Sequence, residues 1–472
     1  MAESLWNATH LKMKTNDLLA KTVILTALIL ADRSALGLEI ADAAGTWRII
    51  NFSMPSRLTV QTDMHRVVTG ITEAEHFENS TGTLNVQANG SFSGSVPDPI
   101  TGTIALGGQG ELIVNANSQD GPQTLTFHIN RTADFMTTCG TTPDGFNDLI
   151  LGLRAPAALQ ASDLAGQWNA TAFQTPHHLV LERNSSNQVI NIRGLGSFGV
   201  YGGVMTINTN GTLSGQIENP FTGTIDSAAN GLVNVTINGE EGPEPLTLFV
   251  NASKDVMALL QSRFDANDNH QELMIFQKAP TNNAARDLAA HWRIITFNAP
   301  MLTQVTDTFG RVTGLGGSTT FEVARQSLVA GHDGFFTAQV GAVATGTFTP
   351  ASSGLVTVNV QVPGEGSDTF SFQLNSSQTL LSSSRDIGDG YELLLVTKSA
   401  PASGPVRDFG LVSIPDVAGM TLNWAATTNG GLQVSTNLTS WQTISNTVGQ
   451  HSYTAPVAGP AVNFYRTVEF TP

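Results

Sequence analysis

Three stretches of sequence decide the fold: residues 45–55 read GTWRIINFSMP, residues 166–176 read GQWNATAFQTP, and residues 290–300 read AHWRIITFNAP. In each stretch a Trp is followed by a Phe five residues later and by a Pro eight residues later. The copies lie 121 and then 124 residues apart, and distant landmarks such as Asn130, Asn251 and Asn375 keep this register. The chain therefore contains three internal repeats.

Each repeat has the pattern of antiparallel β-strands. The segments LTFHIN (125–130), LTLFVN (246–251) and FSFQLN (370–375) place apolar side chains at every second position, as a half-buried strand does. Asn-Gly and Asp-Gly pairs mark hairpin turns, because type I′ turns need positive φ at both central residues. No helical period is sustained between Gly45 and Ala402. We expect an all-β fold with three tandem antiparallel up-and-down barrel-like domains.

A basic residue ends each repeat, followed shortly by Ala-Pro: Arg154, Lys278 and Lys398. A Trp in the first strand with a cation in the last resembles the calycin group, the lipocalins and their relatives. The resemblance implies that the cation lies over the indole and closes one end of the barrel. The implied closing pairs are Trp47 with Arg154, Trp168 with Lys278, and Trp292 with Lys398. From the residues alone, a Trp that anchors the core of another barrel or sandwich remains an alternative.

The repeats give a domain map. We expect barrel repeats at 38–157, 158–281 and 282–402, a linker at 403–417, and a C-terminal β module at 418–472. Trp424, Trp441 and Tyr453 in that tail carry a resemblance to the small C-terminal module of secreted proteins from bacteria of the Verrucomicrobium type. Its periodicity predicts four or five short strands in a sandwich-like module.

The N-terminal segment predicts export. Residues 22–31 (TVILTALILA) have the length of a signal-peptide h-region and are too short to span a bilayer. We expect residues 1–37 to be a signal peptide with a possible upstream extension, with Met13 as the functional start and cleavage after Gly37. A buried core helix is the alternative. The prediction is a secreted or cell-surface protein with no integral membrane segment after cleavage.

Composition excludes some partners and chemistries. Lys and Arg number 22 against 38 Asp and Glu, a net charge of -16, so no basic face for nucleic acid is expected. Cys139 is the sole cysteine, which rules out an intrachain disulfide. We predict no cofactor.

The repeat register also tests candidate sites, because a site essential to each barrel should recur at matched positions. The histidines do not recur, and Gly194, Gly196 and Gly199 form a GxGxxG run that another strand follows, where a dinucleotide site needs a helix. Asp134 and Asp255 align with each other, but Thr379 takes their place in repeat three. We therefore predict no catalytic residues.

One weak metal candidate remains. Asp265, Asn267 and Asn269 place oxygen ligands at alternate positions, as a calcium loop does. The glycine and the distal glutamate of such a loop are absent, and an acidic hairpin turn explains the run equally well.

Three functional hypotheses follow. The first is a non-catalytic extracellular or cell-surface protein whose repeats bind a glycan, matrix or protein partner. The second, implied by the calycin resemblance, is a small apolar ligand inside each barrel. The third is a secreted hydrolase, which the lack of a recurrent site disfavours. Large inward-facing side chains would favour the first hypothesis over the second.

Overall fold

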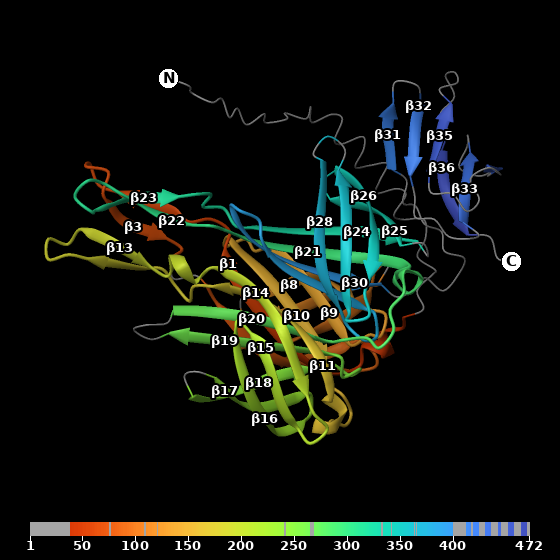
Figure 1. The fold of residues 1–472 in the computed structure, drawn as a ribbon, viewed down its shortest axis with the longest axis horizontal. Helices are drawn as coiled ribbons and strands as arrows, with labels where there is room; N and C mark the ends of the chain where they lie inside the picture. The colour runs from red at the N-terminus through yellow and green to blue at the C-terminus, as the bar shows by residue number, and fades with distance from the viewer. Residues whose placement is uncertain are drawn as a thin grey trace.

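The computed structural model describes residues 38–399, with short gaps at 75–76, 108–109, 120, 240–241, 265–268, 332–333, 341, 363 and 365. It also describes six later strand segments between residues 412 and 469. Three closed eight-stranded antiparallel barrels make up the main body (Figure 1), which confirms the predicted fold class. The predicted signal peptide lies outside the described residues.

Within each barrel the strands pair in chain order, and the first strand closes the ring against the last. Barrel 1 consists of β1 (Gly45–Pro55), β4 (Asn79–Val86), β5 (Ser91–Ser95), β6 (Pro99–Leu106), β7 (Glu111–Ser118), β8 (Gly121–Ile129), β9 (Phe135–Thr141) and β10 (Phe146–Arg154). Barrel 2 consists of β11 (Gly166–Thr175), β14 (Gly199–Ile207), β15 (Thr212–Ile217), β16 (Asn219–Ala229), β17 (Leu232–Gly239), β18 (Gly242–Val250), β19 (Val256–Phe264) and β20 (Asn269–Lys278). Barrel 3 consists of β21 (Ala290–Pro300), β24 (Glu322–Ala330), β25 (Phe335–Val340), β26 (Ala342–Pro350), β27 (Leu355–Val362), β28 (Gly366–Leu374), β29 (Leu380–Asp386) and β30 (Gly390–Lys398).

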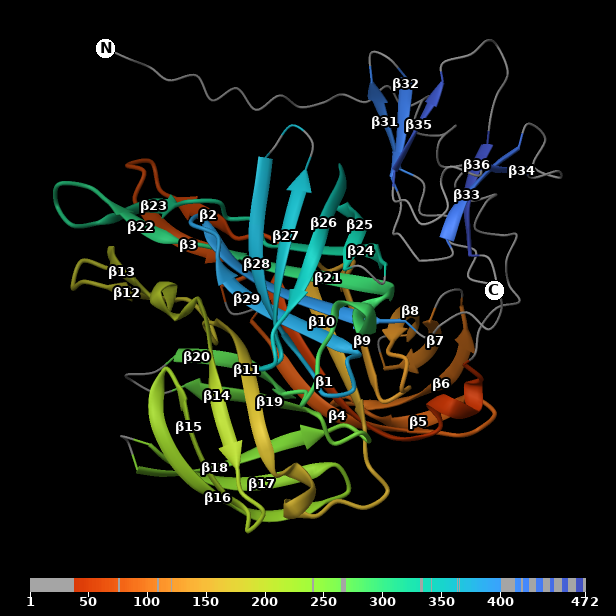
Figure 2. The same cartoon turned by 45° about the vertical axis from the view of Figure 1, so that its right-hand side comes forward.

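A two-stranded hairpin is inserted between the first and second strands of every barrel. The hairpins are β2–β3 (Thr59–Thr62 and Val68–Thr72), β12–β13 (Val180–Arg183 and Val189–Arg193) and β22–β23 (Thr303–Thr306 and Val312–Gly316). They gather on one side of the molecule, away from the barrel walls (Figures 1 and 2). The repeat pattern did not predict this separate layer.

The first strand of each barrel has two buried faces, which explains its unusually apolar sequence. Trp47 and Ile49 point into barrel 1, whose interior they fill together with other apolar side chains. Ile50, Phe52 and Met54 point out of the barrel into a core that all three barrels share. A strand buried on both faces reads as a near-continuous apolar run instead of a strict alternation.

The shared core has approximate threefold symmetry. Phe52, Phe173 and Phe297, one from each barrel, meet edge to face with ring centroids 5.6–6.1 Å apart. A second trio lies toward the hairpins, with centroids 5.7–5.9 Å apart: Phe77, Phe198 and Phe321. The three barrels therefore pack as a trimer does, although one chain supplies them all.

A closed ring of buried hydrogen bonds crosses the same axis near the Trp ends of the barrels. Asn130 Nδ2 donates to Asp134 of its own repeat at 2.8 Å and to Thr379 of repeat three at 3.1 Å. Asn251 donates in the same way to Asp255 and to Asp134, and Asn375 donates to Thr379 and to Asp255. Each asparagine thus links its own barrel to a neighbour. The aligned residues Asp134, Asp255 and Thr379 therefore accept the hydrogen bonds that join the three barrels.

The C-terminal segments form two small sheets. One pairs β31 (Val412–Asp416), β32 (Gly419–Asn423) and β35 (Ser452–Pro456); the other pairs β33 (Gly430–Ser435), β34 (Gln442–Ile444) and β36 (Phe464–Glu469). β31 lies within residues 403–417, the predicted linker. Among the described residues, no helix has the length and apolar character needed to cross a bilayer.

Candidate functional site

The three inserted hairpins form one surface, which we call the crown and define as residues 57–72, 178–193 and 301–317. The crown stands on the shared core, because each hairpin contributes buried apolar side chains to it. The anchoring residues occupy matched positions in the three repeats: Leu58, Val68, Leu179, Val189, Leu302 and Val312. The crown is therefore fixed to the body of the molecule.

The hairpins also bind one another directly. Arg183 Nη2 of the second hairpin donates to the Thr69 carbonyl of the first at 2.7 Å. The Ile192 N–H of the second hairpin donates to Gln304 Oε1 of the third at 3.0 Å. A partner would thus meet three hairpins held at fixed spacing, and would not need to order them on binding.

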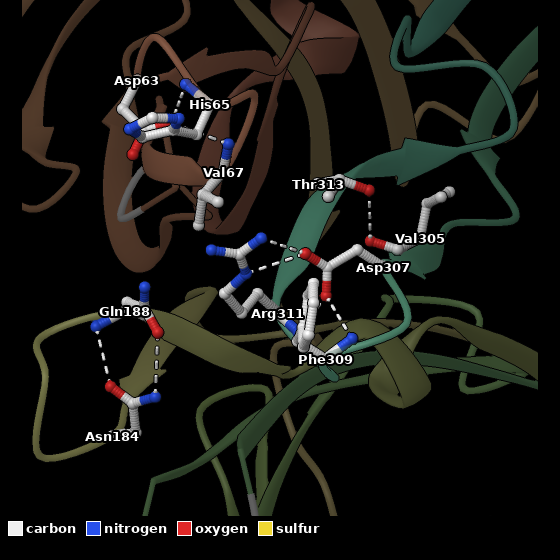
Figure 3. Close-up of polar contacts among 10 residues, drawn as sticks. All are labelled: Asp63, His65, Val67, Asn184, Gln188, Val305, Asp307, Phe309, Arg311 and Thr313. Atoms are coloured by element: carbon white, nitrogen blue, oxygen red, sulfur yellow. Dashed lines mark hydrogen bonds and ion pairs between the residues drawn. The ribbon is translucent and has the colours of Figure 1, made fainter.

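The hairpin tips share one turn geometry, shown close up in Figure 3. Asp63 Oδ1 accepts the backbone N–H groups two and four residues later, at 2.8 and 2.9 Å. Asn184 and Asp307 accept the equivalent pairs at 2.9–3.0 Å. Asn187 has a φ of 60° and Gly310 one of 74°, the left-handed conformation that Asn and Gly adopt most readily. Matched turns therefore present different side chains.

Two of these tips expose large apolar side chains. Met64 is 90% and Phe309 80% solvent-exposed, the highest values among the large apolar residues that the structure describes. Val305 and Ile190, on the strands behind the tips, are also exposed. Only Val204 and Ile387 share this exposure elsewhere in the described chain, so four of six such residues belong to the crown. The second tip presents Ser185 and Ser186 instead.

Phe309 is held in place. The Arg311 guanidinium lies 5.2 Å from the centre of the Phe309 ring and pairs with Asp307 at 2.6 Å (Figure 3). Partial desolvation pushes the pKa of Asp307 up, but hydrogen bonds from the Arg311 side chain and from two backbone N–H groups outweigh it and lower the pKa overall. Asp307 is therefore ionised at neutral pH and keeps Arg311 under the ring.

The crown differs in charge from the rest of the chain. Its three segments contain five arginines and three carboxylates, whereas the whole chain has 38 acidic residues against 22 basic ones. Arg, Met and aromatic side chains are the types enriched in protein interfaces. The crown therefore combines the composition of a binding surface with a sign of charge opposite to that of the barrels.

The structure places each predicted closing pair side by side. Strand pairing sets Trp47 opposite Arg154, Trp168 opposite Lys278, and Trp292 opposite Lys398. Lys278 Nζ lies 5.9 Å from the Trp168 ring centre and Lys398 Nζ lies 5.5 Å from that of Trp292.

Both members of each pair bind a short 3₁₀ helix that precedes the first strand. The indole Nε1 donates at 2.8 Å to a carbonyl four residues earlier, that of Ala43, Leu164 or Leu288. The cation donates to the preceding carbonyl, as Lys278 does to Asp163 at 3.1 Å. In barrel 2 the cation runs past Gly166, where a Cβ would lie 3.0 Å from Lys278 Cε and where φ is 136°. The residues implied by the calycin resemblance thus meet, and the helix that they hold covers the barrel end.

A recurrent acid that the sequence analysis did not single out lies in each last strand, six residues before the cation: Asp148, Glu272 and Glu392. Burial raises the pKa of Glu272 to about 8, and its Oε1 is buried with no hydrogen-bond donor among the described residues. Burial likewise raises the pKa of Asp148, which accepts a hydrogen bond from Ser53. Glu392 is paired with Arg385 at 2.7 Å. The repeat register contained this signal, since the spacing to the cation is constant.

The calcium candidate falls mainly outside the described residues, which omit 265–268. Asn269 is described, and its side chain bonds the backbone of His178 at 2.6 and 3.3 Å. Among the described residues, no three His, Cys, Asp or Glu side chains are grouped as a metal site requires.

Comparison with known proteins adds little. No family model and no curated protein matches the sequence. The chain is 10% identical to a double mutant of the vaccine antigen transferrin binding protein B from Haemophilus parasuis Hp5, with a TM-score of 0.25 over 75% of each chain. It is also 10% identical to isotype 1 transferrin binding protein B from serogroup B Neisseria meningitidis, with a TM-score of 0.21 over 75% of this chain and 76% of that one. At these scores the likeness does not reach the arrangement of the whole chain, and the function proposed below rests on the crown alone.

Proposed function

We propose that this is an exported, non-catalytic binding protein of the cell surface or extracellular space, and that it binds a protein partner through the crown. One observation carries the proposal: four of the six exposed large apolar side chains of the described chain lie on three hairpins that are fixed to one another. Exposed apolar side chains grouped on one surface mark interaction sites, whereas scattered ones do not.

The chemistry of the crown favours a protein over other partners. Arg is among the residue types that supply most binding energy in protein interfaces, and Phe and Met are enriched there, as in the pair Phe309–Arg311 and in exposed Met64. The excess of arginine over carboxylate in the crown suits an acidic partner surface. The second tip, Ser185 and Ser186, adds hydrogen-bonding groups, which an inserted membrane anchor would not need.

The alternative of a small apolar ligand in each barrel is disfavoured by the barrel interiors. Barrel 1 is filled by Trp47, Phe92, Phe127 and the aliphatic side chains between them. Barrels 2 and 3 are filled in the same way around Trp168 and Trp292. Such interiors match the filled form of an eight-stranded barrel.

Site-specific photo-crosslinking tests the proposal. A photoreactive phenylalanine analogue replaces Phe309 or Met64 in the full chain, and the protein is illuminated on cells of the organism that produces it. We expect a discrete protein adduct from both positions and none from the matched control at Ile387, an exposed apolar residue outside the crown. Adducts with lipid alone, equal adducts from position 387, or no adduct at positions 64 and 309 would each contradict a crown-bound protein partner.

A further inference from the structure

A cleft of about 540 Å³ lies between barrels 1 and 3 at the base of the crown. Two backbone hydrogen bonds of 2.9 Å fix its end: Phe321 N–H donates to the Ser56 carbonyl, and Leu58 N–H donates to the Thr319 carbonyl. Barrel 3 contributes Thr296 and Asn298 to the opposite wall. The volume falls within the range of small-molecule sites.

The lining is polar and partly unsatisfied. Asn298 Oδ1 is buried, and no donor of the described chain reaches it. Arg57 at the rim is exposed, and no carboxylate of the described residues lies within ion-pair distance of its guanidinium. Glu322, also at the rim, is exposed. In contrast, both polar atoms of the Asn147 side chain in the floor have a partner: the amide nitrogen donates to the Phe321 carbonyl at 2.9 Å and the oxygen accepts from Thr141 at 2.7 Å.

The missing hydrogen-bond donor at Asn298 Oδ1 and the missing carboxylate at Arg57 indicate which groups a ligand should supply. A buried amide oxygen costs free energy until a donor reaches it, which a hydroxyl group would do. An arginine at the rim binds a planar carboxylate through two parallel hydrogen bonds. Glu322 accepts hydroxyl hydrogens and repels a carboxylate placed beside it, which directs one carboxylate of an acidic ligand toward Arg57. Hydroxyls from Ser56 and Thr141 add further partners for a polyol.

The site occurs once per chain. The positions that match Arg57 in the other repeats hold His178 and Met301, and Ser53 and Gln174 match Asn298. The combination of arginine, carboxylate and buried amide oxygen therefore exists only at the seam of barrels 1 and 3 among the three matched positions. The site differs from the crown in this respect, because every repeat contributes a hairpin to the crown.

We infer that this cleft binds an acidic saccharide, with its carboxylate on Arg57 and a hydroxyl group on Asn298 Oδ1. The inference does not depend on a protein partner for the crown. Binding at the base of the crown would place the sugar beside that partner. The expected stoichiometry is one saccharide per chain, since only one seam carries the groups.

Calorimetric titration of the full chain with trigalacturonate tests the inference, with maltotriose as the neutral probe. We expect one site per chain and at least tenfold weaker binding of maltotriose. Arg57→Gln should weaken trigalacturonate binding about tenfold and leave maltotriose unchanged, while Asn298→Ala should weaken both. Arg66→Gln, at the exposed tip of the same hairpin, is the matched control and should change neither affinity.

Three results would overturn the inference: no binding of either sugar at millimolar concentration, three sites per chain, or an affinity for trigalacturonate that Arg57→Gln does not change. Arg57 is exposed, so its substitution does not endanger the fold. Asn298→Ala, at a cleft residue outside the crown, should leave crosslinking at position 309 intact, which separates failure of this site from failure of the crown.

Discussion

Glu272, Asp148 and Glu392 occupy one position of the repeat in three different electrostatic environments. Arg385 neutralises Glu392, and a hydroxyl group of Ser53 donates a hydrogen bond to Asp148, but no donor in the described part of the chain reaches Glu272 Oε1. Because a buried carboxylate without a partner favours its neutral form, the pKa of Glu272 rises to about 8. The residue therefore keeps its proton at neutral pH in the folded chain and loses it in the unfolded chain.

Glu272 should make stability depend on pH. Its pKa is 4.5 in the unfolded state and about 8 in the folded state, so the free energy of unfolding falls as pH rises through this window and then levels off. Glu272→Gln removes the effect, and the variant should be more stable than the wild type at pH 9 by on the order of 5 kcal/mol. At pH 4 the two should be nearly equal. Urea unfolding at both pH values measures the difference.

The matched control is Glu392→Gln, which breaks a bond to Arg385 and should reduce stability at neutral pH. A destabilised Glu272→Gln variant at pH 9 would refute the assigned environment.

The closing pairs make a second prediction, for which Asp163 supplies an internal control. Lys278 donates to the Asp163 carbonyl beneath Trp168, while Lys254 pairs with the Asp163 carboxylate at the surface. Lys278→Met keeps the apolar stem but loses the hydrogen bond and the ring contact, which should cost about 1–2 kcal/mol. Lys254→Met should cost about 0.5 kcal/mol or less. Thermal unfolding of both variants compares them; equal losses would show that the cation does not close the barrel.

At the scale of elements, sequence patterns predicted the strands but not what they pack against. The alternation at Leu125, Phe127 and Ile129 shows correctly that one face of β8 fills the barrel. The run around Ile50 and Phe52 also indicates burial, but burial inside a barrel and burial between barrels give the same pattern. Sequence reasoning therefore yielded three barrels without the core that joins them.

The sequence analysis did not predict the crown, for a related reason. Asp63, Asn184 and Asp307 keep the repeat register, so their shared turn could have been noticed in the sequence. Their neighbours Met64, Ser185 and Thr308 differ, and a test for recurrent chemistry discards such positions. A search for identical residues at matched positions of the repeats misses a surface whose three hairpin tips carry different side chains. Only the structure shows that the tips lie together.

The tip turns should be locally stabilised by their first side chain. Asp307→Ala removes the acceptor of the Phe309 and Arg311 N–H groups and the partner of the Arg311 guanidinium. Loss of such a cap costs about 1 kcal/mol, so amide hydrogen exchange at these positions should accelerate several-fold. The midpoint of thermal unfolding should stay unchanged, because the tip lies outside the core. Thr308→Ala is the control, and equal acceleration in that variant would show that the side chain of Asp307 does not hold the turn.

At the scale of the whole molecule, the ring of Asn130, Asn251 and Asn375 joins the three barrels through buried hydrogen bonds. Their register was plain in the sequence, but identical residues in identical repeats reveal nothing about contact between repeats. The ring requires each asparagine to serve two barrels at once, and its acceptors are almost completely buried. Any change at one member therefore removes a hydrogen-bond partner from buried polar groups in two barrels.

This arrangement predicts cooperative unfolding of the barrels. In calorimetry of the full chain, barrels that share one core should melt in a single transition, whereas three independent domains would give up to three transitions.

Asp255 accepts the Nδ2 groups of Asn251 and Asn375 and the Ser377 N–H, at 2.8–2.9 Å. Asp255→Ala leaves these donors buried and should lower the free energy of unfolding by about 3–5 kcal/mol. Because the ring joins all three barrels, the variant should keep a single transition at a lower temperature. Asp226→Ala, at an exposed carboxylate of barrel 2, should leave the transition in place. Separate melting of the wild-type barrels, or an Asp255→Ala effect confined to one of them, would show that the shared core and its ring do not couple the repeats.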